Sequence, residues 1–387
     1  MKLAVISHKT IWTDPNSTSG FVTTGGFPFQ IQAVSELFDL TIIMVPVRPA
    51  PPPSGTIPLK GKNLHVFPLN EPSGRGLRRK IAMLFWLPRY LPNIWQKMTT
   101  ADAVHALVPG DIGLIGILVG LAQRKPLFVR HCGTWGEPVT LTDHFLIWLL
   151  ERIAGGRNIV MATGGGESLP SNKNQDINWV FSTTLTCKEL VNMSIAKPWQ
   201  PGKTLRLVTV SRLTPGKNVS AVIRALPIIQ KNYPATTLEV IGDGEKRPEL
   251  EHLVSEMDLK DSVNFHGNIT HARVLDILSR SHLFLFPTQI KEGFPKALLE
   301  AMASSLPSVA SSVSVIPLLL GDECGILINQ ADQRSLAKAV LSLISNPKRM
   351  SMMGSKSRQV AMDYSLEQWR DLIGKRLSAQ WGILNST

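Results

Sequence analysis

The residues best suited to chemistry lie between Glu292 and Ala303, in the stretch Glu-Gly-Phe-Pro-Lys-Ala-Leu-Leu-Glu-Ala-Met-Ala. A short apolar run before it, residues 282–287, predicts a buried strand, and the pattern after the Gly-Phe-Pro turn predicts a helix. Free N–H groups and the positive dipole end at a helix start can bind a phosphate. Glu292 and Glu300 would accept hydrogen bonds from hydroxyl groups of the same ligand, as from a sugar. The alternative is an ordinary strand–loop–helix unit with two solvated glutamates.

Cations and glycines follow other predicted strands of the same half of the chain. These strands are predicted at Leu205–Val210, Leu238–Ile241 and Val263–Phe265. The loops after them carry Arg212 and Lys217, Gly242 and Gly267, respectively. The carboxyl ends of parallel strands share one edge of a sheet, so these residues can line one crevice with the 292–303 stretch. Each cation alone is explained by solvation, but two cations at one strand end, opposite an anion-binding helix, are a stronger indication of function.

The first half of the chain carries weaker candidates. Gly25 and Gly26 end a long polar loop after a predicted strand at Leu3–Ser7, and they permit close approach of the backbone to a ligand. His131 follows a predicted strand at Leu127–Arg130, where α/β folds place residues that contact ligands. A flexible loop entering a helix and a structural histidine are the alternatives.

Length and composition bound the class of protein. A chain of 387 residues suggests two domains of ordinary size. The cysteines Cys132, Cys187 and Cys324 are far apart and odd in number, which fits a reducing compartment. The first residues read as a buried strand rather than a signal peptide, and the longest uncharged apolar run, Ile112–Ala122, is too short to span a membrane. We therefore expect a cytoplasmic protein.

The net charge of +12 suits anionic partners: nucleotides, nucleic acid or a lipid surface. Nucleic acid is not expected as a partner, because there is no basic patch interleaved with aromatic residues. Residues 74–91 differ from their surroundings: Arg75, Arg78, Arg79 and Lys80 precede a pattern with Leu77, Ile81, Leu84 and Phe85 on one helical face. Such a helix is typical of peripheral contact with an anionic membrane. The alternative is that this face packs on the domain core and the arginines are solvated.

Alternating strand and helix patterns run through residues 1–197 and restart after Lys197–Gly202, a segment with two prolines and a glycine that we interpret as a linker. The fold class predicted is α/β, with two doubly wound domains at 1–197 and 198–365. The prediction leaves open that a C-terminal helix, about residues 366–387, packs back on the first domain.

Residues from about 205 to 365 resemble the donor-binding half of the retaining group 1 glycosyltransferases, family 4, which have the GT-B fold. The resemblance rests on six patterns in the usual order: Val210–Asn218, Val240–Gly244, Val263–Gly267, Glu292-Gly-Phe-Pro with Leu299–Ala303, Leu306-Pro307, and Cys324–Ile328. The first half matches only in general layout, as expected where acceptors vary. The resemblance implies two Rossmann-like domains that face each other across a cleft.

The resemblance also implies roles for individual residues. Arg212 and Lys217 would neutralise the donor diphosphate, and the backbone of Gly293, Phe294 and Pro295 would bind the same group. Glu300 would accept from the ribose hydroxyls, and Glu292 would hold the donor sugar near its anomeric carbon. Gly242 and Gly267 would belong to the donor site, and His131 would contact the donor sugar as a second catalytic residue. Gly25 and Gly26 would serve the acceptor side.

The chain departs from the family pattern at Ser305 and at Val313–Leu318, where glycines are usual. A negative leaving group needs a metal or fixed cations and dipoles. The sequence has no Asp-x-Asp and no His/Asp cluster with metal spacing, so no metal and no cofactor other than the nucleotide-sugar co-substrate is expected.

The expected activity is metal-independent transfer of a sugar to an acceptor hydroxyl with retention, in surface polysaccharide or glycolipid biosynthesis. The acceptor would be a glycan or lipid-linked. The alternatives are a GT-B nucleotide-sugar epimerase and a non-enzymatic nucleotide-sugar-binding homologue. The motifs do not specify the nucleotide, the sugar or the acceptor.

Overall fold

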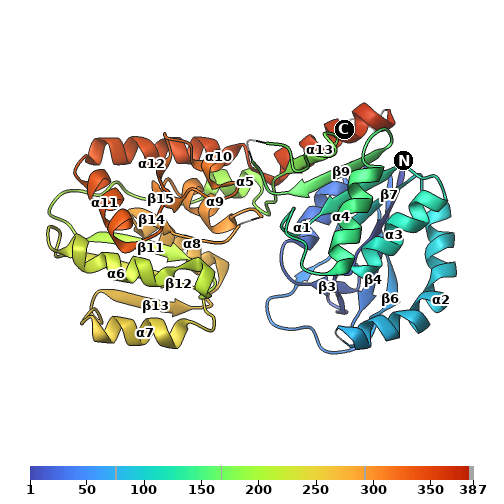
Figure 1. Ribbon diagram of the computed structural model, residues 1–387, viewed down its shortest axis with the longest axis horizontal. Helices are drawn as coiled ribbons and strands as arrows, with labels where there is room; N and C mark the ends of the chain where they lie inside the picture. Colours follow the sequence, from blue (N-terminus) through green and yellow to red (C-terminus); the bar gives the residue numbers. More distant parts are fainter. Residues whose placement is uncertain (75, 167, 292, 383–387) are drawn as a thin grey trace. The chain divides into compact units, whose positions relative to one another are not determined.

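The computed structural model describes residues 1–74, 76–166, 168–291 and 293–382, and most of its helices and many of its strands are labelled in Figure 1. They form two compact units, which we call the first unit (residues 1–184 and 366–387) and the second unit (residues 185–365). The division falls earlier than the predicted one between residues 197 and 198. The predicted linker is not one: Trp199 is buried in the core of the second unit, and its indole N–H donates to the carbonyl of Lys203 at 3.0 Å.

The first unit is built on a parallel sheet with the spatial order β10-β9-β8-β7-β1-β4-β6. Its strands are β1 (Lys2–Ile6), β4 (Leu40–Val47), β6 (Leu64–Asn70), β7 (Ala103–Val108), β8 (Leu127–His131), β9 (Asn158–Thr163) and β10 (Asn178–Val180). The chain order runs outward in both directions from β1, so the sheet has a switch point between β1 and β7. A small antiparallel sheet of β2 (Trp12–Thr13), β3 (Phe21–Thr23) and β5 (Ile57–Pro58) is added to it.

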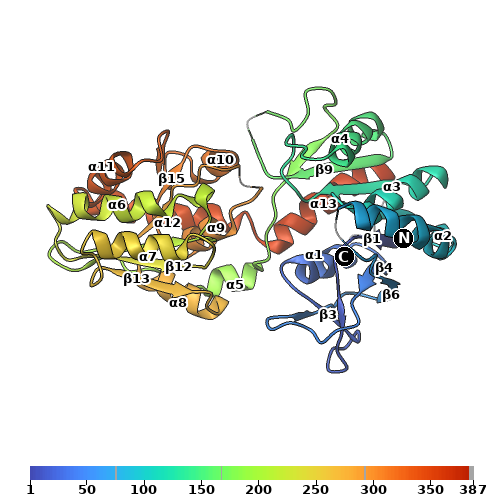
Figure 2. The same cartoon turned by 60° about the horizontal axis from the view of Figure 1, so that its bottom comes forward.

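Helices cover both faces of this sheet. Because side chains alternate along each strand, neighbouring residues of one strand point into different cores. Ala4 and Ile6 of β1 face a core shared with α2 (Leu77–Thr99), α3 (Asp111–Ala122) and α4 (Leu141–Ile153). Leu3 and Val5 face a core shared with α1 (Phe27–Ser35) and α13 (Leu366–Trp381). Helix α13 thus returns to the first unit and lies beside α1 (Figure 2), with its Trp369 fully buried.

The second unit repeats the design with the parallel order β13-β12-β11-β14-β15-β16. Its strands are β11 (Leu205–Val210), β12 (Thr236–Ile241), β13 (Val263–Gly267), β14 (Leu283–Phe286), β15 (Ser308–Ser311) and β16 (Gly325–Ile328). One core lies against α6 (Val219–Gln230), α7 (Arg247–Glu256) and α11 (Gln333–Ile344), and the other against α5 (Cys187–Asn192), α8 (His271–Arg280), α9 (Lys296–Ala303) and α10 (Ile316–Leu320). Helix α12 (Pro347–Met362) contributes to both. The prediction of two doubly wound α/β domains is confirmed.

Helix α2 differs from the helix predicted at 74–91, because it continues to Thr99 with Pro88 and Pro92 inside it. It packs on the core through another face than the predicted one, with Trp86, Ile94 and Met98 buried. The predicted apolar face is exposed: Ile81, Leu84 and Phe85 are 51, 71 and 78% accessible. Packing of that face on the core, the alternative weighed from the sequence, is therefore not what the structure has.

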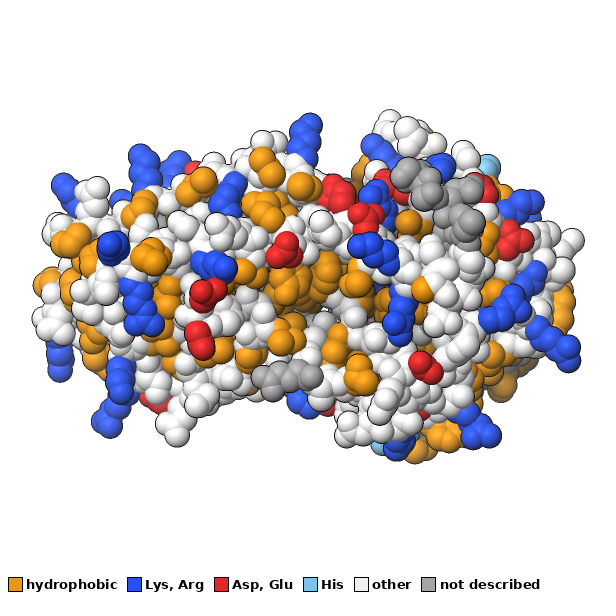
Figure 3. All heavy atoms as spheres, turned by 90° about the horizontal axis from the view of Figure 1, so that it is seen from above, with side chains coloured by type: hydrophobic (Ala, Val, Ile, Leu, Met, Phe, Trp, Pro, Cys, Tyr) orange, Lys and Arg blue, Asp and Glu red, His pale blue; other side chains and the backbone are white. Residues whose placement is uncertain are grey.

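None of the helices in the described ranges combines the length and apolarity needed to cross a membrane. On the face drawn in Figure 3, Lys and Arg side chains are scattered over both units.

Candidate active site

The predicted donor residues of the second unit gather at its own switch point, which lies between β11 and β14. Arg212 and Lys217 follow β11, and the 287–295 loop follows β14. Ligands of open α/β sheets bind outside the carboxyl ends of the strands at such a point. The topology therefore brings the two cations and the start of α9 to one edge of one sheet.

Lys217 ends a short 3-10 helix, η1 (Pro215–Lys217), that is tied to the loop after β14. The backbone N–H of Gln289 donates to the carbonyl of Gly216 at 2.8 Å. A Cβ on Gly216 would lie 2.4 Å from Cγ2 of Ile290, so the approach requires glycine. Lys217 itself is only 9% accessible, and its Nζ lies 5.7 Å from the ring centroid of Phe286. Arg212, by contrast, is exposed.

Gly242 and Gly267 allow the loops after neighbouring strands to touch. Gly242 has a φ of +123°, and a Cβ on it would lie 1.9 Å from the carbonyl oxygen of Ser211. Its N–H donates to the carbonyl of Gly267 at 3.0 Å, and Gly267 has a φ of +64°. The loop carrying Arg212 is thereby held against the loops after β12 and β13. Contact of either glycine with a donor stays a prediction.

The anion site predicted at the start of α9 needs one correction. Pro295 is the N-cap residue of α9, with φ −81° and ψ 86°. Proline has no backbone N–H, so it cannot donate to a phosphate as the sequence reading assumed. The backbone donors before the helix are those of Gly293 and Phe294. A Cβ on Gly293 would meet no heavy atom within 4 Å. Glu292 lies outside the described residues.

Glu300 is oriented by a histidine from another helix. Nε2 of His271, the first residue of α8, lies 3.0 Å from Oε1 of Glu300. The hydrogen bond to Glu300 raises the pKa of His271 above its ordinary value, although partial burial opposes it. A ribose hydroxyl would therefore share this carboxylate with His271.

His131 is the last residue of β8 in the first unit and is buried. Its Nδ1 lies 3.1 Å from the carbonyl oxygen of Gly133, so Nδ1 carries the proton and Nε2 is the acceptor. Burial lowers the pKa of His131, which keeps the ring neutral at pH 7. Trp135 packs edge-on against it, with ring centroids 5.2 Å apart. A neutral, fixed imidazole can accept a hydrogen bond from a sugar hydroxyl.

Gly25 and Gly26 lie just before α1, near the end of β1. Gly25 is exposed with a φ of +75°, and Gly26 is the N-cap of α1. Nζ of Lys9 donates to Oγ1 of the preceding Thr24 at 3.2 Å, which joins this loop to the one after β1.

Two departures from the family pattern keep a glycine-like backbone. Ser305 has a φ of +61° and Ser314 a φ of +53°. Glycine adopts this left-handed region without strain, and serine does so at a cost of about 1–2 kcal/mol. Both serines therefore adopt a backbone conformation that glycine would adopt without strain.

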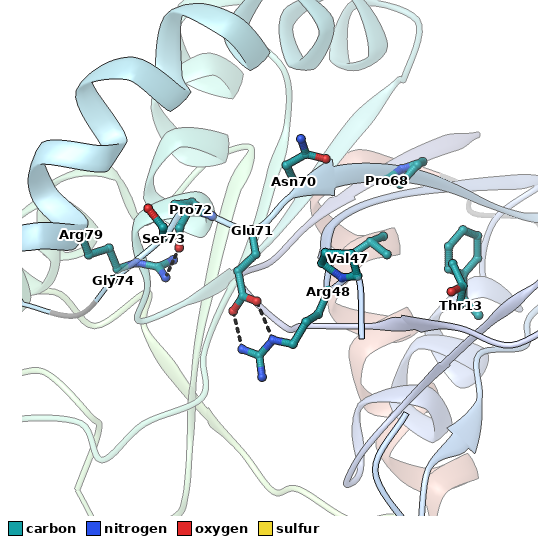
Figure 4. Close-up of a pocket in the computed structure, with 12 residues that line it drawn as sticks. Thr13, Val47, Arg48, Pro68, Asn70, Glu71, Pro72, Ser73, Gly74 and Arg79 are labelled. Carbon is teal, nitrogen blue, oxygen red and sulfur yellow. Dashed lines mark hydrogen bonds and ion pairs between the residues drawn. The ribbon is translucent and has the colours of Figure 1, made fainter. Parts of the chain in front are cut away.

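A set of charged side chains at the carboxyl edge of the first sheet was not predicted from the sequence. Arg48 and Glu71, which follow β4 and β6, form a bidentate ion pair with two contacts of 2.7 Å (Figure 4). Arg79 of α2 forms another with Asp111 of α3, at 2.6 and 3.0 Å. Arg48 and Glu71 each come directly after a strand, the position that singled out His131, but the sequence does not show which charged residues pair.

No group of three or more His, Cys, Asp or Glu side chains that could hold a metal ion occurs within the described ranges.

The two Rossmann-like units define the GT-B fold, and solved structures agree. HepE of Anabaena, in a complex with UDP and glucose, matches 96% of this chain and 100% of its own with a TM-score of 0.65, at 16% sequence identity. Residues 194–360 match the family described as "Glycosyl transferases group 1", which covers most of the second unit. The second unit is therefore similar in sequence to the group 1 glycosyltransferases.

Curated relatives match somewhat less than half of the chain. An exopolysaccharide phosphotransferase of Streptomyces coelicolor is 32% identical over 183 residues, 46% of this chain and 19% of its own length. A GDP-mannose-dependent phosphatidylinositol monomannoside mannosyltransferase of Mycolicibacterium smegmatis is 29% identical over 171 residues, 42% of this chain and 44% of its own. This chain thus spans less than half the length of these relatives.

Proposed function

We propose that this protein is a glycosyltransferase that moves a sugar from a nucleotide-diphosphate donor to an acceptor hydroxyl, with retention and without a metal ion. The observation that carries the proposal is the bond from the Gln289 N–H to the Gly216 carbonyl. It holds the Lys217 loop beside the loop that enters α9, so fixed positive charge and helix-start N–H groups lie at one switch point.

Cleavage of the sugar–phosphate bond leaves negative charge on the nucleotide diphosphate. Preorganised cations and dipoles stabilise such charge in the transition state. In the proposed mechanism Lys217, Arg212 and the N–H groups of Gly293 and Phe294 bind the diphosphate. Glu300 binds the ribose hydroxyls, while Glu292 and His131 bind the sugar being moved.

Retention follows if the acceptor oxygen bonds to the anomeric carbon on the face from which the diphosphate departs. The acceptor hydroxyl then loses its proton to the departing phosphate oxygen, so charge and atoms balance. Homologues named for glycolipid and exopolysaccharide synthesis support acceptors of those classes.

Slow hydrolysis of the donor tests the activity without knowledge of the acceptor. The protein is incubated with UDP-, GDP- and ADP-sugars, and release of nucleoside diphosphate is measured. Release with one donor is expected, and the anomer of the free sugar, followed by NMR, should match that of the donor. Isomerisation of the donor without release would instead identify an epimerase, and binding without turnover a non-enzymatic homologue; the comparisons favour neither.

We also propose that α2 makes peripheral contact with an anionic membrane, at its cytoplasmic face. Support comes from the exposed Leu84 and Phe85, which lie on the same helix as the exposed cations Arg78, Lys80 and Arg89. Arg79 is engaged by Asp111 and is a poor probe. Changing Arg78 and Lys80 to Glu should abolish sedimentation with phosphatidylglycerol vesicles, whereas the double change Lys231→Glu and Lys348→Glu in the second unit should not. Equal sedimentation of both double variants would refute the contact.

A further inference from the structure

Two adjoining cavities open at the carboxyl edge of the first unit's sheet. One, of about 1120 Å³, has a mixed lining, in which Arg48, Asn70 and Glu71 after β4 and β6 are among the polar residues (Figure 4). The other, of about 890 Å³, runs between α2 and α3. Glu71 and Arg79 line both, so the cavities meet at these two side chains.

The junction of the cavities is fixed by ion pairs. Glu71 is held by Arg48 and accepts from Oγ1 of Thr10 at 3.2 Å, while Arg79 is held by Asp111. The hydrogen bonds from Arg48 lower the pKa of Glu71. Burial alone would raise the pKa of Asp111, but the hydrogen bonds and charge of Arg79, the N–H of Ile112 and the charge of His8 together outweigh it, and the pKa is lowered. Both carboxylates are therefore ionised at pH 7 and can only accept hydrogen bonds.

The second cavity begins at the switch point between β1 and β7, where His8 and Asp111 lie. Gly110 makes this possible, because a Cβ there would lie 2.5 Å from Nδ1 of His8. From this polar end the walls become apolar. They are formed by Met83, Leu84, Leu87, Leu114, Ile115 and Leu118.

We infer that the two cavities form the acceptor site and that the acceptor is an amphiphile, with a hydroxylated, anionic head group beside Arg48 and Glu71 in the first cavity and one apolar chain between α2 and α3. This assignment of a substrate class rests on the proposed transferase function. A soluble sugar would leave the apolar walls wet, and an apolar molecule alone would take water from the charged side chains at the junction without replacing its hydrogen bonds.

Charge favours an anionic head. Arg48, Arg79 and Lys80 line the cavities against the carboxylates of Glu71 and Asp111, and the exposed Arg78 lies on the same turn of α2. Hydroxyl groups of the head would donate to Glu71 and Asp111. The apolar chain of the amphiphile would lie along Leu84 and Leu118. Both side chains are exposed in the free protein, so the ligand would cover apolar surface there.

The experiment is a binding measurement without donor. Lysophosphatidylinositol, which has one acyl chain, a phosphate and a hydroxylated ring, is titrated below its critical micelle concentration by calorimetry. Glycerophosphoinositol is the head group alone. The amphiphile should bind at least tenfold more tightly than the head group, and Leu118→Gln should weaken it about tenfold, because the contact of one leucine with the chain is lost.

Leu372→Gln on α13 is the matched control, since Leu372 is 42% and Leu118 46% accessible, and both belong to the first unit. It should bind the amphiphile as the unaltered protein does. A photoreactive group at the chain end should label α2 or α3 within residues 83–88 or 114–118. Equal affinity for amphiphile and head group, equal weakening in both variants, or labelling elsewhere would overturn the inference.

Failure of this inference is distinguishable from failure of the proposed function. Donor hydrolysis by the unaltered protein needs no acceptor and is scored separately. Hydrolysis without chain-dependent binding would sink the amphiphile site alone. Chain-dependent binding without hydrolysis of any donor would support the site and sink the transferase.

Discussion

The switch points of the two units are held together by different forces. In the second unit, backbone contacts fix the loops: Gly242 lies against Ser211, and the Gly216 carbonyl accepts from Gln289. In the first unit, side-chain ion pairs join elements far apart in sequence, as between Arg79 and Asp111. Backbone contacts that need glycine leave a readable pattern in the sequence, whereas an ion pair leaves two ordinary charged residues.

The largest effect should come from adding a methyl group at Gly242. Gly242→Ala places a Cβ 1.9 Å from a backbone oxygen at a φ of +123°, so we expect a loss of about 3 kcal/mol or more in the free energy of unfolding. Gly321→Ala is the control, since Gly321 also has a left-handed φ, +50°, but open space around its Cβ, and about 1 kcal/mol is expected. Chemical denaturation measures both. Similar losses would mean that conformation, and not the close approach, makes Gly242 necessary.

Lys217→Ala should lower kcat/KM for donor hydrolysis by about 10²-fold or more, as expected when a contact to the leaving group is lost. The free energy of unfolding of this variant should change by less than the activation free energy that corresponds to its loss of kcat/KM. Lys231→Ala, at the exposed C-terminal end of α6, controls for the loss of one positive charge. Turnover within threefold of the unaltered protein would refute the role of Lys217.

The ion pairs of the first unit should differ in strength with their exposure. Arg79→Gln should cost about 1–2 kcal/mol of stability, because Arg79 and Asp111 are each less than a third accessible. Arg48→Gln should cost about 0.5 kcal/mol, because Arg48 is 49% accessible. Urea denaturation at pH 7 measures both, and a larger loss for Arg48→Gln would reverse this ranking.

Acid should weaken the same pairs. The folded-state pKa of Asp111 lies below its ordinary 3.8, so its contribution is complete above that pH and is lost as the pH falls through the folded value. The unaltered protein should therefore lose more stability between pH 5 and pH 3 than Arg79→Gln does.

The smallest effect should come from His271. Hydrogen bonding to Glu300 raises its folded-state pKa, so the charged pair persists below the ordinary histidine value and is lost as the pH rises through the folded one. Loss of the charge frees Glu300 for a ribose hydroxyl, so the donor KM should be about two- to threefold lower at pH 8 than at pH 6. His271→Ala should remove this difference; if the difference persists, Glu300 does not couple the histidine to the donor.

Much of the second unit could be read from the sequence. The strands around Arg212, Gly242 and Gly267 were predicted within a residue or two, because parallel strands buried on both faces are continuous apolar runs. The role of Gly216 could not be read, since its neighbour Ile290 lies far along the chain. Trp199 was taken for part of a linker, because the prolines around it hid its burial in the core.

The first unit was readable in its strands but not in its site. The apolar pattern of α2 was recognised, but its orientation was not, because Trp86 and Ile94 compete with Leu84 and Phe85 for the core and only the fold decides between them. Glu71 and Asp111 drew no notice for the same reason: their arginine partners, Arg48 and Arg79, come from other elements.

The return of α13 to the first unit has a consequence for how the chain is made. Trp369, Ile373 and Leu377 complete a core begun by Leu3 and Val5, yet all of residues 185–365 is synthesised between them. The second unit is contiguous and can fold as it leaves the ribosome. The first unit cannot complete its core until α13 has been synthesised, and until then one face of its sheet is partly uncovered. The first unit therefore begins to be synthesised before the second unit but completes its fold after it.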